Sequence, residues 1–221
     1  MKKASRRSSK TATPTAEKLT VNIHKPNTVM LGFHICGITP YVQDRFGPLA
    51  MAGMVDSLTG PRTRSSGKKK LDVEATFKDK LHASSDGWFG IPAAAFRKAI
   101  IDVAALLRHK IDRIKAGIFV HADGMDEFTK QALVRITKGD PIIHCDHVPN
   151  QKRASTLSVR PMWEPGWEAV VRLSVDADLI APDDVATFMM RVGCQVGLGA
   201  GRPLSKSSTG CEWGLFTIVN E

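Results

Sequence analysis

Histidine is the side chain of this 221-residue sequence best suited to acid–base chemistry or metal binding, and it is most concentrated in the run IIHCDHV. There His144, Cys145, Asp146 and His147 follow one another. In a strand, successive side chains point to opposite faces, so His144 and Asp146 would share one face and the other two the opposite face. Four ligands placed this way cannot converge on one ion without a bend. The run therefore favours an exposed strand end, and we expect neither a metal site nor another cofactor.

Single histidines elsewhere leave a catalytic alternative open. His24, His34 and His121 could each act as the general base of an RNA nuclease, because a neutral imidazole accepts a proton near pH 7. A lone histidine fixes no mechanism, however. The sequence contains no HExxH motif, no GxSxG motif and no paired carboxylates at a strand end. It therefore favours a protein without catalytic activity.

The glycine-rich stretch that begins at Val196, VGLGAGRPLSKSSTG, is the other segment whose residue types suggest binding chemistry. It does not match the P-loop pattern, and it follows an expected helix, whereas a dinucleotide-binding loop follows a strand. Glycines such as Gly199 and Gly201 permit positive φ and close backbone approach, and exposed N–H groups in such a turn can receive phosphate oxygens. We expect a helix-to-strand turn that places Arg202 and Lys206 beside a nucleic-acid groove.

The positive charge is concentrated in two segments with little to bury. The formal net charge is +9, of which residues 1–18 carry +5 and residues 59–70 another +5, so the rest of the chain is close to neutral at −1. Mobile cations suit a polyanion, because they neutralise phosphates and release counterions; a solubility tail and a solvated loop are the alternative. The cations expected to contact nucleic acid are Lys2, Lys3, Arg6, Arg7, Arg62, Arg64, Lys68, Lys69 and Lys70.

Several classes of protein are disfavoured by composition. No run approaches the roughly 18 apolar residues of a membrane helix, and the first residues lack the apolar core of a signal peptide. The four cysteines are far apart and form no CxxC pair, which is typical of free thiols in a reducing compartment. We expect a cytoplasmic protein without a membrane partner.

The expected elements follow from apolar periodicity and from turn residues. Strands are expected at 28–38 and 114–122, from Leu133 to Thr137 and from Pro141 to Val148 as a pair, at 155–163 and 167–180 as a hairpin, and at 211–219. Phe46-Gly47-Pro48 is expected to break any long helix before the small, Met-rich segment LAMAGMV. Helices are expected after Pro92, where Phe96, Ile100, Val103 and Leu107 share one face, and after Pro182.

This order of elements predicts one domain. A helix between the first and middle strands, and another before the last strand, follow the ferredoxin-like split βαβ plan; a generic α+β sandwich is the alternative. We expect an α+β fold of RRM-like or RAMP-like type, with an antiparallel sheet, two helices and an inserted basic loop. Residues 1–18 would be a disordered basic arm, and residues 19–221 a single α+β domain with a flexible basic loop at 56–72.

The C-terminal residues carry a resemblance to a known superfamily. The run Gly197-Leu198-Gly199-Ala200-Gly201-Arg202-Pro203, then Gly210 and Trp213-Gly214-Leu215-Phe216, is similar to the glycine-rich loop and closing strand of the RAMP superfamily. Those proteins are ferredoxin-like RNA-binding subunits of CRISPR effectors. More of the chain resembles a family of uncharacterised bacteriophage proteins, through residues 77–100, Trp167-Glu168-Ala169 and the same glycine-rich end. Members of that family have Gly-Glu-Trp-Arg-Pro where this chain has Gly199-Ala200-Gly201-Arg202-Pro203.

The resemblance implies a non-catalytic protein that binds single-stranded DNA or RNA and forms a homo-oligomer or filament along the strand. RAMP backbone subunits polymerise in this way, with an extended loop of one copy reaching over the next. Two alternatives remain. One is a RAMP-like RNA endonuclease that needs no metal and uses His34 or His24; the other is a virion or host-takeover protein whose basic arm holds a genome or a host partner.

Overall fold

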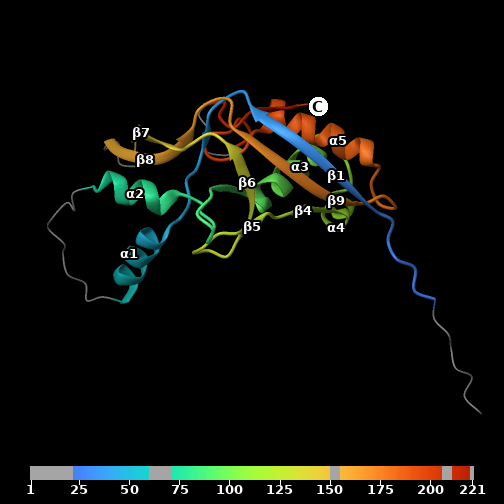
Figure 1. The fold of residues 1–221 in the computed structure, drawn as a ribbon, viewed down its shortest axis with the longest axis horizontal. Helices are drawn as coiled ribbons and strands as arrows, with labels where there is room; N and C mark the ends of the chain where they lie inside the picture. The colour runs from blue at the N-terminus through green and yellow to red at the C-terminus, as the bar shows by residue number, and fades with distance from the viewer. Residues whose placement is uncertain (1–21, 60–70, 150–154, 206–210, 220–221) are drawn as a thin grey trace, which may run out of the picture.

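The computed structural model of the protein describes residues 22–59, 71–149, 155–205 and 211–219. They form a mixed α+β fold (Figure 1). The strands are β1 (Thr28–Gly37), β2 (Tyr41–Val42), β3 (Gly90–Pro92), β4 (Ile118–His121), β5 (Gly124–Met125), β6 (Ala132–Lys138), β7 (Ile142–Pro149), β8 (Ser155–Trp163), β9 (Glu168–Asp176) and β10 (Phe216–Ile218). The helices are α1 (Pro48–Thr59), α2 (Val73–Lys80), α3 (Ala93–Leu106), α4 (Ile111–Gly117) and α5 (Pro182–Arg191), which continues into the π-helical turn η1 (Val192–Val196).

The larger of two sheets has the strand order β10-β1-β9-β6-β3, and all its pairings are antiparallel. β4 and β6 share the second edge of β9, because β4 pairs with residues 172–175 and β6 with Glu168 and Ala169. β5 pairs with the start of β6. The long antiparallel pair of β1 and β9 therefore runs through the middle of this sheet.

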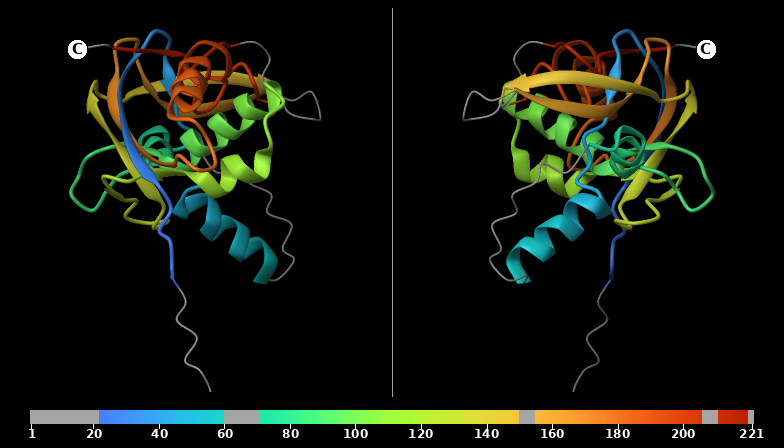
Figure 2. Two further views of the ribbon diagram at one scale, coloured as in Figure 1. Left: turned by 90° about the vertical axis from the view of Figure 1, so that its right-hand side faces the viewer. Right: turned by 90° about the vertical axis from the view of Figure 1, so that its left-hand side faces the viewer.

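Alternating side chains give the large sheet one buried face and one open face. Ile35 in β1 and Leu173 in β9 are fully buried, and they meet Phe96 of α3 and Phe188 of α5 in one apolar core. Burying each such side chain fully is worth about 1.5 to 3 kcal/mol. Figure 2 shows the sheet curving around the helices. The next residues along the strands, such as His34, lie on the open face.

The smaller sheet has the order β2-β8-β7, and α2 packs against β8. A buried aromatic cluster joins it to the larger sheet. The ring of Tyr41 lies 5.5 Å from that of Trp163 and 5.4 Å from that of Trp167, and all three side chains are buried. The two tryptophans lie at the end of β8 and just before β9, so the chain passes from one sheet to the other at this cluster.

The main expectations about the fold class are confirmed. The fold is mixed α+β with antiparallel sheets, β1 begins at the expected residue, and helices follow Pro92 and Pro182. Two proposed strand pairs are wrong. The expected hairpin of β8 and β9 does not form: the two strands belong to different sheets, and Trp163 and Trp167 meet in the aromatic cluster between them. The expected pair of β6 and β7 does not form either, because β6 pairs with β9 and β3, whereas β7 pairs with β8.

Three helices join the two that the sequence predicts. Residues 111–117 form α4, so only the second half of the expected strand 114–122 is extended. No helix precedes Pro48 in the segment after β2, and the Met-rich segment itself forms α1, which begins at Pro48. Proline suits the first turn of a helix, where its missing N–H would have no partner. The expected loop 56–72 contains the end of α1 and Asp72, which caps α2 through its side chain; residues 60–70 lie outside the described residues. None of the helices in the described ranges has the length and apolarity to cross a bilayer.

Candidate nucleic-acid interface

The glycine-rich turn after η1 packs closely against β2 and against Trp213. Gly199 has a φ of 76° and Gly201 a φ of 72°, in the region that favours glycine. A Cβ atom on Gly199 would collide with the Val42 carbonyl, and one on Gly201 would collide with the Trp213 ring. Both glycines are therefore required by the packing of the turn itself.

Backbone hydrogen bonds fix the turn in this position. Ala200 N–H donates to the Val42 carbonyl at 2.9 Å, and Leu198 N–H donates to the Gly214 carbonyl at 3.0 Å. These N–H groups are used inside the protein, so they do not offer the phosphate cradle that the glycines suggest. The Arg202 guanidinium, whose Nη1 donates to the Gly199 carbonyl at 3.0 Å, is the remaining cationic group of the turn within the described residues.

The turn forms one wall of a cavity of about 840 Å³. The opposite walls come from β2, from the segment after α2 and from the β7–β8 pair. The cavity is lined by Tyr41, Gln43, Asp44, His82, Pro92, Ala95, Asp146, His147, Arg160, Gly199, Ala200, Gly201, Arg202, Ser205, Cys211 and Trp213. A hollow of mixed polar and aromatic lining beside a basic turn can receive part of a nucleotide chain.

Arg160 lies in this cavity between two carboxylates. Its Nη1 is 3.5 Å from Asp146 Oδ2, and its Nε is 3.3 Å from Asp44 Oδ2 without the alignment of a hydrogen bond. Asp146 also meets His144, whose Nε2 is 2.8 Å from Asp146 Oδ1. The charge of Arg160 is thus largely balanced. Arg202 has no carboxylate partner among the described residues, so it is the cation of this cavity best placed to meet a phosphate.

A buried histidine–aspartate pair lies behind the cavity. His82 Nδ1 is 3.0 Å from Asp126 Oδ2, and the Asp126 side chain is completely buried. The same carboxylate accepts from Arg45 Nη1 at 2.9 Å and from the N–H groups of Phe128 and Thr129. Burial alone would raise the pKa of Asp126, but hydrogen bonds from Thr129 and His82 and the charge of Arg45 outweigh it and lower the pKa.

The tautomer of His82 follows from this ionised partner. An ionised carboxylate only accepts, so Nδ1 carries the proton and donates to Asp126. Burial lowers the pKa of His82 below its ordinary value of 6.5, against the opposing influence of Asp126. His82 is therefore neutral at pH 7, which leaves Nε2 as a hydrogen-bond acceptor on a residue that lines the cavity.

Gln43 holds the backbone around His82. Its side-chain oxygen accepts from His82 N–H at 2.8 Å, and its Nε2 donates to the Gly90 carbonyl at 2.9 Å. Because Gln43 is almost fully buried, loss of these bonds would leave unpaired polar groups in the interior. Gln43 is thus a positioning residue for the cavity wall.

Comparisons with known proteins give a fold relationship only. No family model matches this chain, and no curated protein matches it. One solved chain, from the cryo-EM structure of the type III-B Cmr-β complex bound to cognate target RNA, has a TM-score of 0.53 and 11% sequence identity. The match covers 87% of this chain and 59% of that chain. The fold is similar to that of a Cmr subunit, which agrees at a coarse level with the RAMP-like resemblance.

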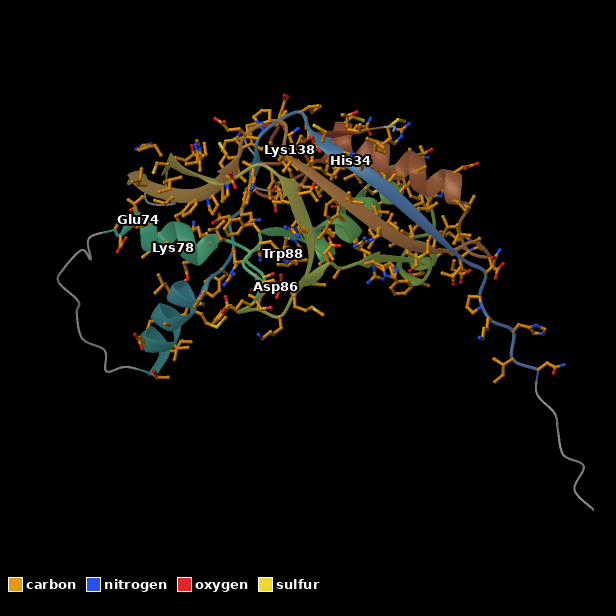
Figure 3. The ribbon with its side chains drawn as sticks, viewed as in Figure 1. His34, Glu74, Lys78, Asp86, Trp88 and Lys138 are labelled. Atoms are coloured by element: carbon orange, nitrogen blue, oxygen red, sulfur yellow. The ribbon has the colours of Figure 1, made fainter. Side chains whose placement is uncertain are left out.

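The histidines considered as general bases, His24, His34 and His121, do not line the cavity. His34 is on the open face of β1, where its Nε2 is 2.9 Å from Glu168 Oε2; Lys138 Nζ donates to the other oxygen at 2.6 Å (Figure 3). The hydrogen bond to Lys138 lowers the pKa of Glu168, and the same bond raises the pKa of Lys138. His24 lies in the exposed segment before β1.

Most of the cations predicted to bind nucleic acid lie outside the described residues. This holds for Lys2, Lys3, Arg6, Arg7, Arg62, Arg64, Lys68, Lys69, Lys70 and Lys206. Of the predicted binding residues, Gly199, Gly201 and Arg202 are described, and all three line the cavity. Within the described residues, no group of three or more histidine, cysteine or acidic side chains has a geometry that could hold a metal ion.

The sequence alone did not reveal His82, Asp126 or Arg160. His82 and Asp126 are 44 residues apart, and Arg45 and Asp126 are 81 apart. No short motif joins them. The only local signal was that Asp126 precedes a polar turn, which does not distinguish a turn residue from a buried partner of a histidine.

Proposed function

We propose that this protein binds single-stranded nucleic acid without cleaving it, and that copies assemble along the strand. The observation that carries the proposal is the place of the Gly199–Arg202 turn in the wall of a cavity of about 840 Å³, with Arg202 unpaired by any described carboxylate. A basic turn beside aromatic and polar walls is typical of sites that follow a nucleic-acid backbone. The similar Cmr chain comes from a complex bound to target RNA, which supports the same class of ligand.

We further propose that the central elements form a ferredoxin-like core. In chain order, β1, α3, β4, β9, α5 and β10 follow the β-α-β-β-α-β plan of that fold. The other elements are then additions: β2, β3, β5, β6, β7, β8, α1, α2 and α4. Among them, β2, β7 and β8 form the small sheet, which lies next to the glycine-rich turn. The cations of residues 1–18 and 59–70 would supply most of the affinity, and a bacteriophage origin fits the family resemblance.

Gel shifts at low salt with single-stranded DNA, single-stranded RNA and duplex test the binding. We expect retention of the single strands and a steep loss of affinity as salt rises, because phosphate neutralisation releases counterions. Arg202→Gln should weaken binding to every sequence alike, while the matched Arg191→Gln change on α5 should not. No shift with any of the three probes at low salt would refute the proposal, and shortened RNA on denaturing gels would favour the endonuclease.

A further inference from the structure

Helix α1 is an apolar helix that the rest of the described chain leaves uncovered. None of its residues is buried, and five large apolar side chains are exposed by 43 to 80%: Leu49, Met51, Met54, Val55 and Leu58. The helix stands away from both sheets beside α2 (Figures 1 and 2). Isolated helices of 12 residues are marginal in water, so such a surface is expected to be covered.

A concave apolar surface lies toward the other end of the molecule. It is a groove of about 1000 Å³ lined by residues 32–34 of β1, Val170, Ala186, Thr187, Met190 and residues 217–219, and we call it the β1/α5 groove. Met190 is 59% exposed and Val170 39%. β10 pairs only with Ile35–Gly37, so the preceding part of that edge of β1 has no partner strand among the described residues. Exposed strand edges are usually covered.

One glycine in each surface has no explanation within a single copy. Gly32 in β1 and Gly53 in α1 have an ordinary φ, and a Cβ atom on either would have no other atom within 4 Å. Every other described glycine has either a positive φ or a close neighbour. Glycine weakens both strands and helices, and it is found where another backbone approaches closely. Both glycines are accounted for if α1 meets the groove.

Resting on the proposed function, we propose that α1 of one copy docks in the β1/α5 groove of the next copy. Charge does not oppose this contact. Asp56 is the one charged residue of α1, and beside the groove the Glu168 carboxylate that contacts His34 is already balanced by Lys138. Helix and groove lie on different parts of the surface, so the contact is heterologous, and on an extended strand it links one copy to the next as an open chain.

The size of the contact explains why it would need the nucleic acid. A helix of 12 residues is about 18 Å long and 10 to 12 Å wide. One of its faces covers much less than the roughly 800 Å² per partner of a stable complex. Copies bound to one strand are held at high effective concentration, which makes a weak contact sufficient.

The experiment uses two variants that should not harm the fold. Gly53→Ala and Gly32→Val add side chains where a single copy has open space, so each monomer should be at least as stable as the wild type. Sedimentation velocity on a strand long enough for many copies should show chains for the wild type and separate copies for either variant. A 1:1 mixture of the helix variant Met54→Glu and the groove variant Met190→Glu keeps one intact contact, and it should give pairs that do not extend.

Binding of single copies is measured separately on a short oligonucleotide. Failure to bind it would refute the proposed function. The docking would still be judged by cross-linking of concentrated protein without nucleic acid, between cysteines introduced at Leu58 and Met190 after the exposed Cys145, Cys194 and Cys211 are changed to serine. Chains in either glycine variant, closed dimers in the wild type, or mixtures that extend like the wild type would overturn the docking proposal. So would normal binding to the short oligonucleotide without any chains on the long one.

Discussion

His82 Nδ1 donates to Asp126 Oδ2 across 3.0 Å, and this bond joins the cavity wall to a completely buried carboxylate. Because Arg45 Nη1 meets the same oxygen at 2.9 Å, one acid is paired with a neutral imidazole and a cation. The His82–Asp126 pair therefore keeps the His82 imidazole neutral and holds it in position at the cavity wall.

The first prediction concerns pH. Since the pKa of His82 is lowered from its ordinary value of 6.5, the unfolded chain binds a proton more readily than the folded protein. The contribution of neutral His82 to the free energy of unfolding is fully present above the unfolded-state pKa of about 6.5. It is lost as the pH falls from there through the lower pKa of the folded state. Asp126, whose pKa is also lowered, adds a further loss below its ordinary value of 3.8. Thermal unfolding between neutral and acid pH should show this decline.

His82→Gln supplies the control for that prediction. Glutamine can keep a hydrogen bond to Asp126 but does not titrate, so the variant should have a flatter stability profile between pH 5 and 7. An unchanged profile would assign the decline to other histidines.

The second prediction concerns the loss of Asp126. Asp126→Ala would leave Arg45 buried without its charged partner, and Arg45 is only 7% exposed. Removing one member of a buried ion pair costs about 3 to 5 kcal/mol of the free energy of unfolding. Asp102→Ala, which breaks the exposed Lys98–Asp102 pair, should cost about 1 kcal/mol or less. Equal urea midpoints for the two variants would contradict the burial argument.

The sequence predicts those elements whose signals lie among neighbouring residues, and it does not predict pairings that depend on contacts between distant residues. β1, α3 and α5 follow from periodicity and from proline positions, which depend on neighbouring residues. The proposed hairpin of residues 155–163 and 167–180 failed because both segments alternate correctly, and only Trp163 and Trp167 meeting Tyr41 decides that they enter different sheets.

In the candidate site too, residues that are contiguous in the sequence could be predicted, and residues that meet only in the folded chain could not. The turn with Gly199, Gly201 and Arg202 was predicted because its residues are contiguous. The role of its glycines could not be predicted. Gly199 lets the turn approach the Val42 carbonyl, which is distant in the sequence, and Gly201 makes room for the Trp213 ring. His82 and Asp126 required the folded structure, because the segments that carry them are separated by α3, α4 and β4.

The third prediction contrasts two glycines. Gly53→Ala should raise the free energy of unfolding of the single copy by up to about 1 kcal/mol, because alanine is the better helix former and its Cβ meets open space. Gly201→Ala should lower it by more than about 1 kcal/mol, because φ is 72° there and the Cβ would enter the Trp213 ring. Urea titrations of dilute protein without nucleic acid measure both changes. If Gly53→Ala lowered the free energy of unfolding, the claim that α1 is uncovered in the single copy would be wrong.

The last prediction tests where the affinity resides. Changing Lys68, Lys69 and Lys70 to glutamine should weaken binding to single strands and make the slope of log affinity against log salt less steep. Each cation that contacts a phosphate contributes roughly 0.7 to 0.9 to this slope, so a loss of about 2 to 3 is expected if all three make contact. The same charge change at Lys110, Arg113 and Lys115 around α4, all exposed, provides a matched control. If both triple variants reduce the slope equally, net charge alone governs binding, and the basic segment has no special role as an interface.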